Sequence, residues 1–542
     1  METLDYPKVL QHLASYCQTE PAKNIIFQSS GQYTTKTKHL ATSTATPLSS
    51  PNYEGVIDRY DAILEYDELL YTGVKQPSFA SDLNFGPILK SASDGAILEC
   101  EDIREISRGL STVSSIVDWL EEIEKINKDD TDGEKKYVQI PQLGMNVCLV
   151  DDSLRDLLAT AFDDEGKLSG LTFPKLGQLR KEVAIIRKQI LSKIDGLMKS
   201  PQFSRMLSVE GSYFSEVNGR FVLPVQPTHK NAVGIVHDTS RTGKTVYVEP
   251  KEIVEPTNEM KQTEVFLKQE ESRILRSLTS KIMQNRDDIE RALEAAAQID
   301  LLVAKSRLQS VMGGIVPEVK NEGVVNVVQA SHPVLLLKGN DVVPNDISLG
   351  KDENSGLVLS GPNSGGKTII LKLLGLLSMM CRDGIPLPIK SGRVDYFFPV
   401  LADIGDMQNV NEDLSTFSGH LLVCKNVLER SSKNSLVLMD EMGSGTDPKQ
   451  GVALARSLLE GIVNKGAKVA ITTHYYELKQ FAAEDSRFSI AGMEFDNGYP
   501  TYKMVRHFNL FCILITTTST ALCGETTYSF VPCICDFRSL EK

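Results

Sequence analysis

The sequence predicts a multidomain protein with a helical core, two long helices that carry a small β-rich domain, and a C-terminal α/β domain. At 542 residues the chain is long enough for three or four domains with cores of their own. Two segments with extended helical periodicity bracket a stretch rich in β-branched residues, and the last third contains short apolar runs that end in polar motifs. These patterns together predict a mixed helical and sheet architecture.

The N-terminal part, residues 1–165, is predicted to be the helical core. Apolar residues recur with helical spacing from Leu4, and the periodicity returns between Val56 and Ile126. Between these stretches, residues 28–52 are rich in Ser, Thr and Gln and contain almost no large apolar side chains. That composition is typical of a disordered insertion, because it offers too little apolar surface to bury.

Residues 166–330 are predicted to form two lever helices with a β-rich clamp between them. Lys175 to Ser200 repeats apolar residues at spacings of three and four, as in a coiled coil. Thr257 to Met312 contains no Gly or Pro, and one unbroken helix of that length would span roughly 80 Å. Residues 203–250 read as strands joined by turns, so we expect a clamp at the tip of antiparallel arms. Two ordinary helices of a larger bundle are the alternative.

The predicted clamp carries three basic side chains in its loops, Lys230, Arg241 and Lys244. A charge cluster is usually a solvated face, but at the end of two long arms it could grip a polyanion. We therefore expect these residues to bind nucleic acid through phosphate contacts. Gly243 to Thr245 mimics a phosphate-binding loop, but Asp238 stands where the first glycine should be, so no nucleotide is expected there.

The most specific motif opens the α/β domain, residues 331–505. It is a phosphate-binding loop made of eight consecutive residues: Gly361, Pro362, Asn363, Ser364, Gly365, Gly366, Lys367 and Thr368. Its glycines let the backbone form a nest of N–H groups around a polyphosphate. Lys367 can reach the β- and γ-phosphates, and the Thr368 hydroxyl can ligate Mg²⁺. An apolar strand before the loop and an apolar helix after it would add a helix N-terminus, so ATP and Mg²⁺ are the expected ligands.

Two further motifs follow the loop in the order that ATP hydrolysis requires. Asp440 and Glu441 end an apolar run, where Asp440 would hold Mg²⁺ through water and Glu441 would polarise the attacking water. His474 ends another apolar run and could sense the γ-phosphate. Each motif alone is weak, but the ordered set predicts an ATPase.

Composition and charge narrow the class of protein further. The net charge of −13 is unlike that of a protein that only coats nucleic acid, so DNA contacts must come from a local basic patch. No apolar run is long enough to predict a membrane span, and the N-terminus lacks the layout of a secretion signal or a transit peptide. Most of the 9 cysteines are scattered, which suits a reducing compartment. We expect an intracellular, soluble protein, from a plastid if the source is a plant and otherwise cytoplasmic.

The motifs of the α/β domain closely resemble the MutS family of ABC-type DNA-repair ATPases. The family's acidic block and Gly-Thr turn are matched by Asp440 to Pro448, its Ser-Thr-Phe signature by Ser415 to His420, and the entry to its ATPase core by Pro344 to Ile347. The Asp-Pro pair after the turn and the segment Val222 to Pro250 are closer to the second, bacterial and plastid branch, which is associated with suppressing recombination. The resemblance extends from the N-terminus to about residue 505, apart from the polar insertion.

The resemblance implies an ABC-type P-loop ATPase domain and assigns the same roles as the residues themselves, with Glu441 as general base and His474 as switch histidine. It adds Ser415, which would approach the nucleotide of the opposite subunit in a homodimer that sandwiches two ATP molecules. Asp406 and Gln408 would lie in the loop that links ATP to the arms.

The implied function is an ATP-dependent DNA clamp that reads the shape of branched or mismatched DNA in DNA repair or negative regulation of recombination. Direct mismatch reading is not expected, because the chain begins in helical material and has no Phe-x-Glu wedge in a suitable N-terminal domain. An ATPase acting on stalled or collided ribosomes, and a truncated form without ATP turnover, are the alternatives. A structural arm protein of the chromosome-cohesion type would require a far longer coiled coil.

After Met504 the sequence departs from the family pattern. The family continues with a Gly-Pro-Gly-Ser-like turn and a helix, whereas residues 506–542 are Thr- and Cys-rich. We expect an aberrant, non-family tail from a truncated isoform or a read-through. The branch's dimer-stabilising helices and small nuclease-type domain would then be missing, so no endonuclease activity is assigned to these residues.

Overall fold

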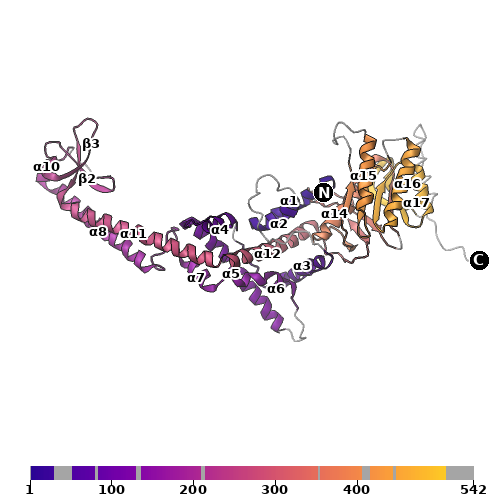
Figure 1. The fold of residues 1–542 in the computed structure, drawn as a ribbon, viewed down its shortest axis with the longest axis horizontal. Helices are drawn as coiled ribbons and strands as arrows, with labels where there is room; N and C mark the ends of the chain where they lie inside the picture. The colour runs from indigo at the N-terminus through magenta and orange to yellow at the C-terminus, as the bar shows by residue number, and fades with distance from the viewer. Residues whose placement is uncertain are drawn as a thin grey trace, which may run out of the picture. The chain divides into compact units, whose positions relative to one another are not determined.

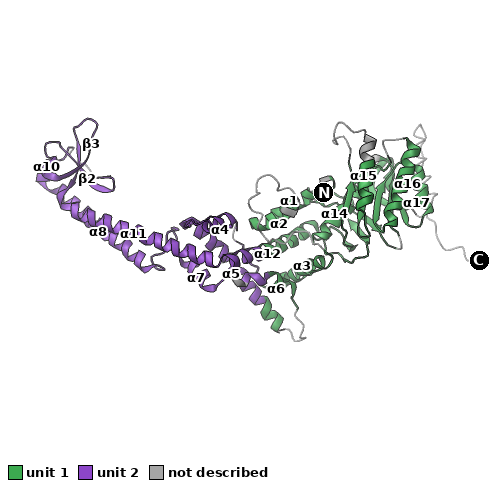
Figure 2. Cartoon of the chain, viewed as in Figure 1, with its two compact units in different colours: residues 1–75, 123–143, 297–542 green, residues 76–122, 144–296 purple. Residues whose placement is uncertain are grey.

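A computed structural model describes residues 2–29, 52–79, 83–129, 136–208, 214–351, 354–405, 416–443 and 447–507. It divides into two compact units, shown in Figure 2. Unit 1 comprises Met1–Lys75, Ile123–Leu143 and Ala297–Lys542, and unit 2 comprises Gln76–Glu122 and Gly144–Ala296. Most of the predicted polar insertion, Asp406, Gln408, Ser415 and the chain beyond His507 lie outside the described residues.

The N-terminal part is helical, including the two stretches in which the apolar periodicity predicted helices. Its helices are α1 (Tyr6–Tyr16), α2 (Glu20–Ser29) and α3 (Glu54–Thr72) in unit 1, α4 (Gly86–Ser93) and α7 (Asp152–Thr160) in unit 2, and α5 (Cys100–Asp129) and α6 (Gln139–Gly144), whose residues belong to both. In α1 the buried side chains include Val9, Leu10 and Leu13, the spacing of one helix face. None of the helices in the described part of the chain is long and apolar enough to cross a membrane.

Two long helices of unit 2 pack against each other in antiparallel directions (Figure 1). They are α8 (Pro174–Lys199) and α11 (Lys251–Gln284), and the short α9 (Pro201–Ser204) follows α8. Lys175 near the start of α8 pairs with Glu270 in α11 at 3.0 Å, whereas Lys193 near the end of α8 donates to the Glu252 carbonyl at 3.5 Å. The start of α8 therefore lies beside the later part of α11 and its end beside the start of α11, and Ile186, Ile190 and Ile194 of the apolar stripe are buried.

The segment predicted as one possible unbroken helix, Thr257 to Met312, is divided. Helix α11 ends at Gln284, and α12 (Arg286–Met312) begins after Asn285, whose φ of −104° leaves the helical region. The Asn285 side chain donates to the Lys281 carbonyl at 3.0 Å. Asn can compete with the helical hydrogen bonds in this way, which explains why a stretch without Gly or Pro still breaks.

A four-stranded antiparallel sheet lies between α8 and α11 in the chain, as predicted for residues 203–250. Its strand order is β1-β2-β4-β3, with β1 (Ser215–Val217), β2 (Arg220–Val225), β3 (Gly234–Thr239) and β4 (Val246–Pro250). Phe221, Leu223 and Val248 pack into one apolar cluster with Ile190 of α8 and Ile253 of α11. The sheet is thus anchored on the two helices by its apolar face.

The largest sheet belongs to unit 1 and has the order β13-β12-β7-β11-β10-β9. Its strands are β7 (Gly356–Ser360), β9 (Val400–Asp403), β10 (Leu436–Met439), β11 (Lys468–Thr472), β12 (Phe488–Asp496) and β13 (Tyr499–His507). All are parallel except β13, which runs antiparallel to β12. The helices between them are α14 (Lys367–Arg382), α15 (Thr416–Arg430), α16 (Pro448–Asn464) and α17 (Tyr476–Glu484). Because parallel strands end at one edge of a sheet, the residues after β7, β10 and β11 meet there.

A second sheet of unit 1 is antiparallel, with the order β6-β5-β8. Its strands are β5 (Val325–Ala330), β6 (Asn345–Leu349) and β8 (Ser391–Val394), and the short α13 (Pro333–Leu337) follows β5. Strand β13 extends to His507, and the Arg506 side chain donates to the Ser348 carbonyl of β6. Arg506 and His507, the first two residues of the predicted non-family tail, are therefore part of the sheet.

Candidate nucleotide site

The phosphate-binding loop joins the buried strand β7 to helix α14 through the short 3₁₀ turn Asn363–Gly365. Gly361 and Gly366 have φ values of 130° and 94°, a region that L residues with side chains rarely occupy. A Cβ on Gly365 would lie 3.0 Å from the Cβ of Met493, so a side chain at this position would crowd Met493. Glycines are favoured here both by backbone angle and by space. Gly366 directly precedes α14, whose first N–H groups have no helical partner and can bind an anion.

Lys367 is buried in this loop and curls back over it. Its Nζ donates to the carbonyl of Gly361, the first residue of the loop. Burial lowers the pKa of the Lys367 ammonium, and the nearby carboxylates of Asp440 and Glu441 act in the opposite direction. The loop thus encloses a cationic group beside the helix N-terminus, the combination that attracts a polyphosphate.

Thr368 and Asp440 meet across the sheet edge, as the predicted Mg²⁺ ligands should. The Thr368 hydroxyl donates to Asp440 Oδ2 at 2.8 Å. Among the residues that the structure describes, no group of three or more His, Cys, Asp or Glu side chains could hold a metal alone. A hydroxyl and one carboxylate are oxygen donors suited to Mg²⁺, which usually keeps waters and takes further ligands from substrate phosphates. The residues present therefore fit Mg²⁺ bound jointly with a nucleotide.

Glu441 and His474 follow neighbouring strands and face each other. His474 Nε2 lies 3.7 Å from Glu441 Oε1, and the two side chains are 47% and 46% exposed. Glu441 has a φ of 47°, a strained value for a residue with a long side chain, and such strain is often found at functional sites. Burial, with Lys367 in second place, lowers the pKa of His474, although Glu441 opposes the shift. At neutral pH the imidazole is therefore uncharged, beside a carboxylate that water can reach.

Thr472, the last residue of β11, is a site residue that the sequence reasoning missed. Its hydroxyl donates to Asp440 Oδ1 at 2.5 Å and accepts the backbone N–H of Glu441 at 2.8 Å. One buried hydroxyl thereby fixes both acidic residues. The motif itself carried no signal for this role, because the contact depends on β10 and β11 being adjacent and in register, with Met439 opposite Ile471.

Several predicted residues cannot be placed. Ser415 and Gln408 lie outside the described residues, as does the side chain of Asn363. Pro362 and Ser364 lie in the loop as predicted from the motif.

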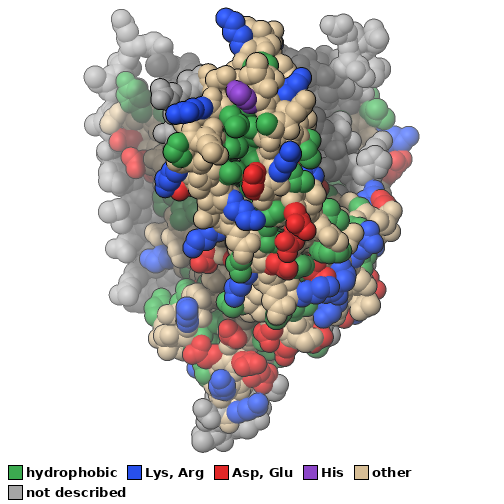
Figure 3. Space-filling view, turned by 90° about the vertical axis from the view of Figure 1, so that its left-hand side faces the viewer, with side chains coloured by type: hydrophobic (Ala, Val, Ile, Leu, Met, Phe, Trp, Pro, Cys, Tyr) green, Lys and Arg blue, Asp and Glu red, His purple; other side chains and the backbone are tan. Residues whose placement is uncertain are grey.

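The three basic residues predicted to bind nucleic acid belong to unit 2 and are all exposed. Lys230 begins the short helix α10 (Lys230–Val233), which leads directly into β3, so the prediction that it lies in a loop is wrong. Arg241 and Lys244 lie in the turn between β3 and β4. Because they flank opposite ends of β3, they do not form one compact cluster. Figure 3, which views the molecule from the left-hand side of Figure 1, shows Lys and Arg side chains spread over the near face with hydrophobic ones between them.

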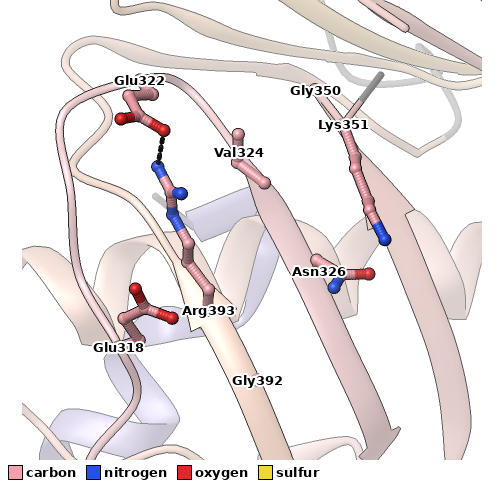
Figure 4. Close-up of a pocket in the computed structure, with 8 residues that line it drawn as sticks. All are labelled: Glu318, Glu322, Val324, Asn326, Gly350, Lys351, Gly392 and Arg393. Atoms are coloured by element: carbon pink, nitrogen blue, oxygen red, sulfur yellow. Dashed lines mark hydrogen bonds and ion pairs between the residues drawn. The ribbon is translucent and has the colours of Figure 1, made fainter.

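Figure 4 shows a hollow on the three-stranded sheet of unit 1, and none of its lining residues belongs to the phosphate-binding loop. Its lining residues are Glu318, Glu322, Val324, Asn326, Gly350, Lys351, Gly392 and Arg393. The Arg393 guanidinium is already paired with Glu322 at 2.6 Å and with Asp395 at 2.7 Å, and Glu318 pairs with Lys320 at 2.8 Å. Together with Lys351, these residues supply three cations and three carboxylates, so their charges cancel and the hollow has no net charge to attract an anion or a cation.

The loop and the strand-end carboxylates indicate a nucleotide-binding protein, and comparison with known proteins agrees with this class. Residues 357–509 match the family described as MutS domain V. This match begins within β7 and includes the loop, the two carboxylates and His474.

Relatives match most of the chain. It is 35% identical over 511 residues to "Endonuclease MutS2" of Carboxydothermus hydrogenoformans, which covers 93% of this chain and 60% of that protein. It is also 35% identical over 426 residues to the Enterococcus faecalis "Endonuclease MutS2", covering 78% of this chain and 52% of the relative. The "Putative endonuclease MutS2" of Bacillus subtilis is 35% identical over 434 residues, covering 79% and 54%. The chain belongs to the MutS family, in the MutS2 branch, and it spans a little more than half the length of these relatives.

Proposed function

We propose that this chain is a MutS-type ATPase that binds ATP with Mg²⁺ at residues 361–368 and hydrolyses it with Glu441 as the general base. The observation that carries the proposal is the 2.8 Å contact between the Thr368 hydroxyl and Asp440. It joins the loop to the acidic strand end, although the two residues are far apart in sequence. A phosphate loop without a carboxylate at this place could bind phosphate but would lack the second half of an Mg²⁺ site.

Each residue of the site has a separate task in this proposal. The loop N–H groups and Lys367 hold the phosphates and stabilise the charge that develops on them. Thr368 and Asp440 hold Mg²⁺, which neutralises phosphate charge when bound. Glu441 accepts a proton from the attacking water, and the uncharged His474, 3.7 Å away, orients that water or the γ-phosphate.

The test separates binding from turnover in the full chain. Lys367→Ala should abolish binding of a fluorescent ATP analogue, whereas Glu441→Ala should bind it normally and lose about 100-fold or more in turnover. The matched control is Glu484→Ala, a carboxylate at the end of α17 that is remote from the loop in sequence and exposed. ATP turnover that persists in Glu441→Ala would refute the assigned chemistry.

We further propose that ATP binding is coupled to DNA binding by the sheet of unit 2, in a homodimer in which Ser415 of each subunit approaches the other subunit's nucleotide. What supports this is the family membership together with the exposed Lys230, Arg241 and Lys244 on that sheet and its turns. The substrate would be branched or mismatched DNA recognised by shape. The word "endonuclease" stands in the names of relatives of which this chain spans only part, and we do not propose endonuclease activity for this chain.

A competition experiment tests the substrate. Branched DNA and purified ribosomes are offered to the chain with ATP, and the bound fraction of each is measured. Preference for branched DNA supports the proposal, and preference for ribosomes would replace DNA by RNA as the polyanion. Size-exclusion chromatography with ATP tests the dimer, because a monomer could not complete a site shared between subunits.

A further inference from the structure

Tyr502 lies against the phosphate-binding loop, and packing in the core does not explain why its side chain is partly exposed. If Gly366 had a Cβ, that atom would lie 3.2 Å from Tyr502 Cδ1, so the ring is in contact with the residue that precedes α14. Yet the side chain is 47% exposed. A tyrosine that only filled a gap in the core would be buried, whereas this ring covers the loop with part of its surface and leaves the rest open to solvent.

The backbone is distorted at this position. Tyr502 has a φ of 58°, a left-handed value that is rare for a bulky residue. The register of β12 and β13 shifts between Met493 and Phe495, so Tyr502 lies in a bulge of the hairpin. Bulges beside active sites redirect a side chain. Here the bulge belongs to the same hairpin whose Met493 contacts the position of Gly365.

A buried asparagine holds the distorted segment in place. Asn345 Nδ2 donates to the Tyr502 carbonyl at 3.1 Å, and Asn345 Oδ1 accepts the Met504 N–H at 2.6 Å. The Lys503 ammonium donates to the neighbouring Pro344 carbonyl at 2.8 Å. Strain that is stabilised by several specific contacts is typical of a functional position.

We propose that Tyr502 binds the nucleoside part of the nucleotide, with its exposed ring face stacked on the base. This inference rests on the proposed function. Gly366 adjoins the N–H groups that would hold the phosphates, so a nucleoside leaving the loop beside Gly366 meets the Tyr502 ring. Every base has a π face that stacks on an aromatic ring, so the contact favours nucleotides over inorganic polyphosphate without choosing between bases.

The experiment compares two probes with the full chain by isothermal titration calorimetry with Mg²⁺: the non-hydrolysable ATP analogue AMP-PNP and inorganic tripolyphosphate. Tyr502→Ala and Tyr502→Leu should each weaken AMP-PNP binding about tenfold, because stacking is lost. Both should bind tripolyphosphate as the wild type does, and Tyr502→Phe should retain the affinity for AMP-PNP. Tyr499→Ala, an exposed tyrosine of the same hairpin, is the control.

The outcomes are distinct. Tyr502→Leu retains apolar packing on Gly366, so it tests stacking even if the Ala variant does not fold. Equal weakening of both probes in Tyr502→Leu would mean that Tyr502 only supports the loop, and unchanged AMP-PNP affinity would mean that it does not contact the nucleoside; either result overturns the inference. A wild-type chain that binds neither probe overturns the proposed function itself.

Discussion

The Thr472 hydroxyl lies 2.5 Å from Asp440 Oδ1 and also accepts the backbone N–H of Glu441. Thr472 is fully buried, whereas Asp440 and Glu441 are partly exposed, so the hydroxyl holds both residues from the inner side of the sheet edge. Two acidic residues with different proposed tasks, holding a metal ion and activating water, thus share one small support. This arrangement explains how a residue that would touch neither phosphate nor metal can control both steps.

Thr472→Val should therefore reduce both stability and turnover. Valine keeps the shape but removes the hydrogen bonds to the Glu441 N–H and the Asp440 carboxylate, which should lower the free energy of unfolding by about 1–3 kcal/mol in urea denaturation. ATP turnover should fall more than nucleotide affinity, because Lys367 and the loop are unchanged. Thr473→Val is the control, since Thr473 is equally buried but its hydroxyl accepts the Tyr475 N–H instead. Equal loss of turnover in both variants would contradict the support role.

Replacing the three basic residues of unit 2 by alanine should weaken DNA binding and its dependence on salt. Each phosphate contact that is lost should reduce the slope of log K against log salt concentration by about one. Because Lys230 and the Arg241–Lys244 turn flank opposite ends of β3, the effect of Lys230→Ala should add to the effect of changes in the turn. Fluorescence anisotropy at several salt concentrations measures this.

The control for DNA binding is Lys199→Ala, an exposed lysine of α8 that is already paired with Asp195 at 2.6 Å. Its charge is partly neutralised within the protein, so its removal should leave the slope unchanged. A triple variant with the wild-type slope would show that DNA, if bound, contacts another surface.

Glu249 should be a critical residue of the small sheet. It is fully buried and accepts hydrogen bonds from Arg220 at 2.9 Å, with His237 Nε2 2.8 Å away. Glu249→Ala leaves the guanidinium without its carboxylate in a poorly solvated place, and we expect a loss of about 3 kcal/mol in the free energy of unfolding. Glu216→Ala on β1 of the same sheet is the matched control, because its pair with Arg187 is solvent-exposed and should contribute less than about 1 kcal/mol. Similar losses in urea denaturation would contradict this difference.

Lys305 should make the free energy of unfolding depend on pH in the alkaline range. Burial lowers its pKa from 10.5 to about 7, with Arg59 adding to the shift and Asp383 and Cys17 opposing it. Between these two values the unfolded chain holds the proton and the folded chain does not, so the free energy of unfolding rises with pH. The slope from this group is at most about 1.4 kcal/mol per pH unit.

Urea denaturation at several values between pH 7 and 10 checks this prediction. Lys305→Met should remove the rise, whereas Lys338→Met, at an exposed lysine of the same unit, should keep it. Parallel pH profiles for wild type and Lys305→Met would show that Lys305 keeps its proton in the folded state. The Lys305 side chain donates to the Asp383 carbonyl at 2.7 Å. Lys305→Met also removes this hydrogen bond, and that loss of stability should not depend on pH.

Much of the architecture could be predicted from local pattern. The helix periodicity located α1, α3, α5, α8 and α11, and apolar runs located β2, β3, β4, β7, β10 and β11 but not the other strands. The position of the helix break at Asn285 could not be found in this way, since it depends on a side-chain hydrogen bond and not on Gly or Pro. The sequence pattern also could not show that Lys230 lies in a helix, at the other end of β3 from Arg241.

The sequence by itself determined the loop chemistry of this protein, because Gly366, Lys367 and Thr368 act within one turn of backbone and their spacing contains their geometry. It also determined that Asp440, Glu441 and His474 follow apolar strands. Only the tertiary structure decided which of these strands are neighbours, and therefore that Thr472 supports both carboxylates and that Tyr502 reaches Gly366. The physical reason is that strand order and bulges arise from packing between distant segments, which no local pattern records.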